Sequence, residues 1–129
     1  MKKSLFTLAL LISFSSFGQT SSEYFTSAVN KSDKGDYYGA ISDYTRAIEI
    51  KPNYPEAYLN RGLSKARLED YKAAIVDYNK AIEIKPNYAL AYSNRAIAKE
   101  LSGIDGCADA RKAKELGYNA DELIEMICN

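Results

Sequence analysis

The residue types that could perform catalysis are scarce in this sequence. It has no histidine, which removes the commonest general base, the serine–histidine and cysteine–histidine nucleophile pairs, and the commonest metal ligand. It also has no glycine-rich phosphate loop. We therefore expect no catalytic site, no metal and no cofactor. An acid–base site made from lysine or tyrosine is the enzymatic alternative that the composition leaves open.

Two cysteines, Cys107 and Cys128, lie near the C-terminus. They are not spaced as a CxxC motif, so the sequence does not support a zinc site or a thioredoxin-like redox site. Two interpretations remain. The cysteines either form a disulfide with each other or are two separate free thiols.

Charged residues recur at a fixed spacing. Arg61 and Arg95 are as far apart as Asp43 and Asp77, so each arginine follows one of these aspartates at the same distance. The simple interpretation is an ion pair between neighbouring structural units, and the functional alternative is a grip on a partner's carboxylate. A ladder of lysines with the same spacing is typical of a solvated face. It consists of Lys31, Lys65 and Lys99.

The first residues have the pattern of a secretory signal. Lys2 and Lys3 precede an apolar stretch at 5–17, and Gly18 ends a run of small residues suited to cleavage before Gln19. We predict a signal peptide at 1–18 and export to the periplasm or outside the cell. The alternative, a membrane anchor, needs roughly 20 apolar residues, which is more than this stretch provides. We expect no membrane span after signal removal.

The rest of the chain, 19–129, contains an internal repeat. The twelve residues that begin at Asp43 recur from Asp77 onward with ten of twelve positions identical. Repeats of this length indicate a stack of similar structural units. The units are 21–54, 55–88 and 89–117.

Small and aromatic residues recur at corresponding places in these units, and together they predict pairs of closely packed helices. The recurring sets are Ala28, Gly62 and Ala96; Ala40, Ala74 and Gly106; Ala47, Ala81 and Ala113; and Tyr24, Tyr58 and Tyr92. Glycine and proline positions mark the helix ends. The pattern predicts helices near 22–33, 37–50, 56–68, 71–84, 90–101 and 106–116. No alternation of period two supports strands, so the fold class is all-α.

This unit resembles the tetratricopeptide repeat, whose pattern places aromatic, small, tyrosine, alanine and proline residues at set positions. Units one and two match through Tyr24, Ala28, Tyr37, Ala40, Tyr44, Ala47 and Pro52, and through Tyr58, Gly62, Tyr71, Ala74, Tyr78, Ala81 and Pro86. Unit three departs from the pattern, with two residues missing near Gly103 and no terminal proline. The resemblance covers about residues 21–117. It implies a right-handed superhelical α-solenoid that binds other proteins.

The segment 119–128 is predicted to be a capping helix, from about 120 to 128. Asn119 could cap its N-terminus, with Glu122 three residues on. Its apolar residues Leu123, Ile124, Met126 and Ile127 would cover the last unit. If this helix packs antiparallel to the one near 106–116, the sulfurs of Cys107 and Cys128 come out level, which favours a disulfide in an oxidising compartment.

In the tetratricopeptide family the first helix of each unit lines the inner face. The residues expected there, as candidates for partner binding, are Phe25, Thr26, Val29, Leu59, Asn60, Leu63, Arg67, Ser93, Asn94 and Ile97. The core does not require their apolar members, and asparagine can both donate to and accept from a peptide backbone. The alternatives are packing against an N-terminal tail and an ordinary surface.

Some family members clamp a C-terminal carboxylate with lysine, asparagine, asparagine, lysine and arginine. The corresponding places here hold Phe25, Val29, Asn60, Leu90 and Asn94, and only one matches. We therefore expect an internal or apolar segment of another protein as the partner. Nucleic acid is not expected, because 17 basic residues are balanced by 17 acidic ones. The alternative function is a self-associating structural protein of a cell-envelope assembly. The sequence does not indicate the oligomeric state.

Overall fold

The computed structural model describes residues 18–129, and within this range all regular structure is helical. The predicted signal peptide lies outside the described residues except for Gly18. The helices are α2 (Ser21–Asp33), α3 (Tyr37–Ile50), α4 (Pro55–Arg67), α5 (Tyr71–Ile84), α6 (Ala89–Leu101), α7 (Cys107–Glu115) and α8 (Asp121–Ile127). Each helix begins and ends within one residue of its predicted bounds. The all-α prediction is confirmed.

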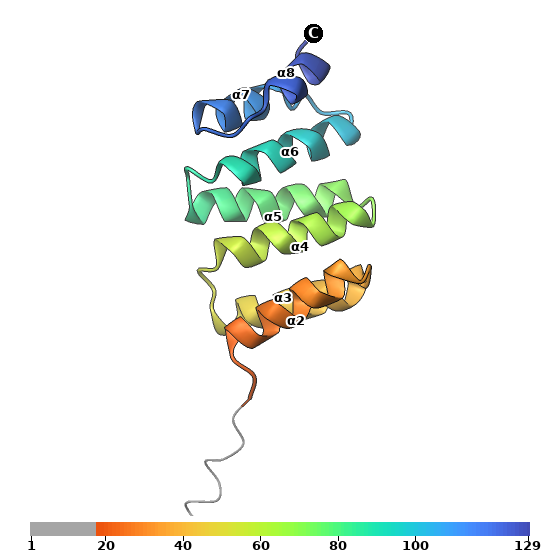
Figure 1. Cartoon of the computed structure of the whole chain (residues 1–129), viewed down its shortest axis with the longest axis vertical. Helices are drawn as coiled ribbons and strands as arrows, with labels where there is room; N and C mark the ends of the chain where they lie inside the picture. Colours follow the sequence, from red (N-terminus) through yellow and green to blue (C-terminus); the bar gives the residue numbers. More distant parts are fainter. Residues whose placement is uncertain (1–17) are drawn as a thin grey trace, which may run out of the picture.

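The helices form one continuous stack in chain order (Figure 1). Each helix packs against the next, and α2 also meets α4, as α4 meets α6. The first helices of the three units therefore lie side by side and form one face of the stack. None of the helices within residues 18–129 has both the length and the apolarity needed to cross a bilayer.

The core is built from small residues facing large ones, as the repeat predicts. The alanines at the recurring small positions are fully buried, and Tyr44 and Tyr78 are the largest buried side chains. A Cβ atom on Gly62 would lie 2.6 Å from the ring of Tyr78, and one on Gly106 would lie 2.3 Å from the carbonyl oxygen of Ala96. The helices can approach this closely only because those two positions carry no side chain.

The turns within units one and two are made in the same way. Asp36 and Asp70 accept hydrogen bonds from the backbone N–H groups of Gly39 and Ala73, at 2.9 and 3.2 Å, and so cap α3 and α5. The residue before each of these aspartates has a positive φ. In unit one it is Gly35 (φ 81°), but in unit two it is Glu69 (φ 62°).

Replacing Glu69 with glycine is expected to stabilise the protein by about 1 kcal/mol, because the left-handed conformation costs a residue with a Cβ atom roughly that much. Chemical denaturation of Glu69→Gly beside the wild type measures the effect. The matched control is Gly35→Glu, which should destabilise unit one for the same reason. A lower midpoint for Glu69→Gly would contradict this account of the turn.

The end of the stack departs from the prediction in two details. Ala120, not Asn119, is the N-cap of α8, and no side chain provides a capping hydrogen bond there. Asn119 is exposed because the turn after Gly117 (φ 94°) directs it to solvent. Leu123, Ile124 and Ile127 are half-buried, but Met126 is 73% exposed and does not cover the last unit. A helix of only seven residues has room for one packed face.

Candidate functional site

The face formed by α2, α4 and α6 carries two neighbouring hollows. The α4–α6 hollow, of about 300 Å³, is lined mainly by apolar side chains that include Leu63, Tyr71, Ile97 and Leu101. The α2–α4 hollow, of about 230 Å³, is more polar and is lined by Val29, Ser32, Asp33, Tyr44 and Asn60. Leu63 and Arg67 line both hollows. We refer to the two hollows together as the inner groove.

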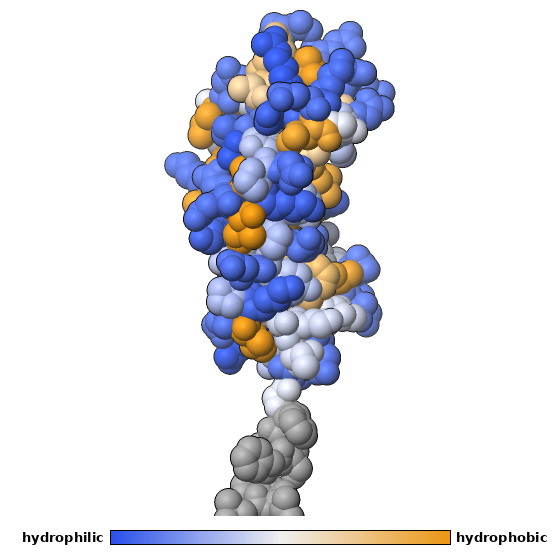
Figure 2. Space-filling model, turned by 90° about the vertical axis from the view of Figure 1, so that its left-hand side faces the viewer, coloured by the Kyte–Doolittle hydropathy of each residue, from blue (hydrophilic) through white to orange (hydrophobic). Residues whose placement is uncertain are grey.

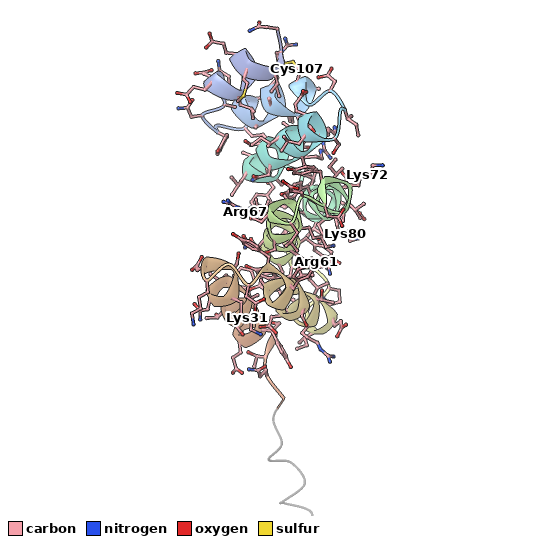
Figure 3. All side chains as sticks on the ribbon, turned by 90° about the vertical axis from the view of Figure 1, so that its right-hand side faces the viewer. Lys31, Arg61, Arg67, Lys72, Lys80 and Cys107 are labelled. Carbon is pink, nitrogen blue, oxygen red and sulfur yellow. A yellow bond between two sulfur atoms is a disulfide. The ribbon has the colours of Figure 1, made fainter. Side chains whose placement is uncertain are left out.

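Six of the eight residues proposed for partner binding line the inner groove. They are Val29, Asn60, Leu63, Arg67, Asn94 and Ile97. Ile97 is 42% exposed and Leu101 is 57% exposed, so the core does not use all of their apolar surface. Figure 3 shows Arg67 on the side of the stack opposite Lys72 and Lys80, which lie on the second helix of the same unit.

The other two proposed residues, Phe25 and Leu59, belong to the core. The Phe25 ring stacks on Tyr54, with centroids 5.0 Å apart, and meets Tyr44 edge-on at 5.5 Å. Leu59 is only 2% exposed. The expectation that the core does not require these two side chains is wrong. Ser93, which corresponds to Leu59 in the next unit, is also buried, because this helix position faces the core.

Polar groups in the groove differ in how far they are already bonded. The Asn94 amide donates to the carbonyl oxygen of Leu90 at 2.8 Å, so its own oxygen is the group left to accept a bond. Burial, with a smaller contribution from Asp33, raises the pKa of Tyr44 to about 12. The Tyr44 hydroxyl therefore stays neutral at physiological pH and can serve only as a hydrogen-bonding group.

Arg61 and Arg95 pair with aspartates of their own units. Arg61 donates through Nε and Nη2 to Asp77 at 2.9 and 2.7 Å. Arg95 binds Asp109 in the same way, at 2.8 and 2.6 Å. The predicted salt bridges to Asp43 and Asp77 of the preceding units are therefore wrong. Each arginine does reach the preceding unit by one hydrogen bond, from Nη1 of Arg61 to Thr45 at 3.1 Å and from Nη1 of Arg95 to Asn79 at 2.9 Å.

The lysine ladder is part of the same arrangement and is not simply the solvated face that its spacing predicts. Lys31, Lys65 and Lys99 lie 2.8, 2.9 and 2.7 Å from Asp43, Asp77 and Asp109, respectively. Lys65 and Lys99 are mostly buried, with 22% and 25% of the side chain exposed. Each unit therefore contains an aspartate–lysine pair between its two helices.

These ion pairs make stability depend on acid. Burial alone would raise the pKa of Asp109, but hydrogen bonds from Arg95 and Lys99 outweigh it and hold the pKa below its usual value. For Asp43, Lys31 and Ser27 likewise outweigh burial and lower the pKa. A lowered folded-state pKa stabilises the fold above the unfolded value of about 4, and this stabilisation is lost as pH falls through the folded-state pKa.

We therefore expect the free energy of unfolding to fall as pH drops below about 4. The Asp109→Asn variant should be less stable at neutral pH but should show a shallower decline in acid, because one of the responsible carboxylates is gone. Denaturant titrations between neutral and strongly acidic pH measure both slopes. Equal slopes in the acid range would show that Asp109 does not contribute.

Cys107 and Cys128 are joined by a disulfide, with Cα atoms 5.1 Å apart. Cys107 begins α7 and Cys128 follows the end of α8, so the bond ties the capping helix to the last unit. Within residues 18–129, no group of three or more histidine, cysteine or acidic side chains is arranged to hold a metal ion.

The comparisons with known proteins agree with this geometry. The "Tetratricopeptide repeat" family matches residues 55–88, and a second family described as "TPR repeat" matches residues 32–69. None of the curated proteins compared with the sequence matches it.

Several solved structures resemble the whole stack. The first tetratricopeptide domain of Spaghetti, solved with the HSP90 peptide SRMEEVD, is 25% identical, with 87% of this chain and 93% of that chain covered and a TM-score of 0.81. The first such domain of human RPAP3 is 24% identical, with 84% and 90% covered and a TM-score of 0.80. MamA is 27% identical, with 75% and 54% covered and a TM-score of 0.72.

A stack of paired helices with an inner groove defines the protein as a helical-repeat solenoid. More specifically, the matched repeats and the shared fold show that the chain belongs to the tetratricopeptide-repeat family.

Sequence reasoning missed part of the groove. Tyr71, Ala98 and Leu101 line the α4–α6 hollow but were not predicted to do so. Leu101 could have been found, because it occupies the place of Arg67 in the next unit and follows Ile97 by about one helical turn. Tyr71 begins a second helix, and its approach to the groove depends on the angle between α4 and α5, which the spacing does not encode.

Proposed function

We propose that this protein is an interaction module that binds a segment of another protein in the inner groove. The observation that carries the proposal is the exposed apolar lining at the junction of the two hollows. Val29, Leu63 and Ile97 occupy the same place in successive units and line the groove on three first helices. A segment lying across them would contact all three units.

The chemistry of the groove favours an internal segment with at least one apolar side chain. The α4–α6 hollow would receive that side chain against Leu63, Ile97 and Leu101. Backbone groups of the segment would bond to Asn60 and to the free oxygen of Asn94. Phe25 and Leu90 stand where a carboxylate clamp would need lysines, so a free C-terminus is not the favoured ligand. The peptide-bound Spaghetti domain supports the general mode of binding.

Affinity capture with paired variants tests this proposal. Ile97→Asp places a charge in the α4–α6 hollow, whereas the control Val76→Asp places the same charge at a 65% exposed position on α5. We expect the captured partner to be lost with Ile97→Asp and retained with Val76→Asp, with both variants helical. Retention by both would show that the partner binds elsewhere.

We also propose that the protein is exported. Two features support this: the signal-like pattern at 1–18, and a disulfide, which persists in oxidising compartments. Intact-mass analysis of the protein from its native cells tests the proposal. A chain that begins at Gln19 is expected, and a full-length cytosolic chain would contradict export.

Self-association into an open array is less well supported. Adjacent units are linked by an arginine that donates to a threonine or asparagine of the preceding unit. The two ends of the stack lack these groups, since Ser27 replaces the arginine and Arg111 replaces the acceptor. In addition, α8 packs on α7 at the C-terminal end (Figure 1).

A further inference from the structure

Unit one lacks a side chain that the other two units hold internally. In units two and three an arginine lies between an aspartate and a tyrosine ring. The guanidinium carbons of Arg61 and Arg95 lie 5.4 and 5.2 Å from the ring centroids of Tyr58 and Tyr92. Each guanidinium also makes two hydrogen bonds to its aspartate, a geometry that only arginine provides.

The other parts of this arrangement are present in unit one. Tyr24 corresponds to Tyr58, and Asp43 corresponds to Asp77, but Ser27 occupies the position of the arginine. Among residues 18–129, no lysine or arginine lies over the Tyr24 ring. Unit one therefore has the aromatic platform and the carboxylate without the guanidinium.

The hydrogen bonds of Asp43 leave room for that guanidinium. Ser27 donates to Oδ2 of Asp43 at 2.6 Å, and Lys31 lies 2.8 Å from the same oxygen. Within the described part of the chain, Oδ1 accepts no hydrogen bond. In contrast, both carboxylate oxygens of Asp77 are bonded, one to Arg61 alone and the other to Arg61 and Lys65. The Asp43 side chain is also more exposed, at 13% against 2% for Asp77.

The surface beside this position is open. A shallow depression of about 500 Å³ lies along α2 and is lined by Thr26, Ser27, Asn30 and Lys31. In the later units, α4 and α6 instead pack against α3 and α5 of the preceding units. In Figure 3, Lys31 lies in the part of the stack nearest the N-terminal end.

We propose that this open face of α2 binds an arginine side chain of a partner protein. The guanidinium would donate to Asp43 and lie over the Tyr24 ring, as Arg61 and Arg95 do in the later units. The charges match, because Asp77 and Asp109 each hold one arginine and one lysine, whereas Asp43 holds only Lys31. The site is separate from the inner groove and does not depend on the function proposed for that groove.

Nuclear magnetic resonance titration with N-acetyl-arginine amide tests the site, with N-acetyl-lysine amide as the comparison ligand. We expect shifts centred on Tyr24, Ser27 and Asp43, with arginine binding at least about threefold more tightly, because a lysine ammonium cannot make the paired bonds. Shifts spread over the whole surface, or equal affinity for the two ligands, would overturn the proposal.

The variant Ser27→Arg fills the same site from within. It should abolish the arginine-dependent shifts and raise the denaturation midpoint, while the control Ser27→Ala should keep the shifts. Persistence of the shifts in a folded Ser27→Arg protein would overturn the proposal, as would their loss in Ser27→Ala. The groove variant Ile97→Asp should bind arginine amide as the wild type does, so this result and the groove experiment can fail independently.

Discussion

Replacing Arg61 with alanine is expected to destabilise the protein by about 3 kcal/mol, because removing one partner of a buried ion pair leaves the other charge uncompensated. Asp77 is 2% exposed and loses two of its three charged hydrogen bonds in this variant. Lys65 remains beside it and limits the loss. The hydrogen bond to Thr45, which links units one and two, is also removed.

The control for this prediction is Arg46→Ala, the same substitution at a surface pair. Arg46 and Glu49 are 63% and 58% exposed, so the pair should contribute less than about 1 kcal/mol. Urea denaturation at neutral pH compares the two variants. If Arg61→Ala costs no more than Arg46→Ala, the arginine–aspartate pairs do not hold the helices of a unit together. Binding in the inner groove should be unchanged in Arg61→Ala, provided that the protein is folded.

Reducing the disulfide is expected to cost about 3 kcal/mol, as a loop of this length predicts. The sequence separation of Cys107 and Cys128 is only 21, but the bond carries the whole of α8. A helix as short as α8 is not stable alone in water, and α8 has only its half-buried face to hold it on the stack. We therefore expect α8 to detach or to open frequently after reduction.

Hydrogen exchange measures this directly at the amide of Cys128, which donates to Ile124 at 2.9 Å. Its protection should fall sharply in Cys128→Ser, and the midpoint of denaturation should fall with it. A reductant should have no further effect on Cys128→Ser, which controls for the treatment itself. Truncation after Gly117 should cost at least as much as reduction. An unchanged midpoint after reduction would contradict the proposed role of the cap.

The fold could be predicted from the sequence because each unit repeats its local signals. A glycine such as Gly35 at the end of a first helix and a proline such as Pro52 after a second helix place the helix bounds within one residue. The small residues that recur in each unit also predict the buried alanines. Signals of this kind are local and do not depend on how the helices are angled.

The arginine partners could not be predicted from spacing, because two spacings recur almost equally well. Asp43 precedes Arg61 and Asp77 follows it at similar distances along the chain, and both distances recur in the next unit or nearly so. Antiparallel packing decides between them. Arg61 lies as far before the end of α4 as Asp77 lies after the start of α5, so the two side chains are level across the turn.

The inner groove was only partly predictable for a similar reason. Helical spacing places Leu59, Leu63 and Arg67 on one face of α4. Their exposure differs, because α4 is tilted against α5 and α6: Leu59 is buried, Leu63 is half-buried and Arg67 is exposed. The surface as a whole mixes apolar and polar residues (Figure 2), so hydropathy alone does not mark the groove.

The most direct test of the central claim is to map where a partner lies on the stack. A photo-crosslinking residue is placed at Asn60, inside the groove, and in a second protein at Lys72, on the opposite side of the stack (Figure 3). Binding in the inner groove predicts a crosslink from position 60 to an internal, apolar segment of another protein and none from position 72. A partner crosslinked from position 72 alone would contradict it.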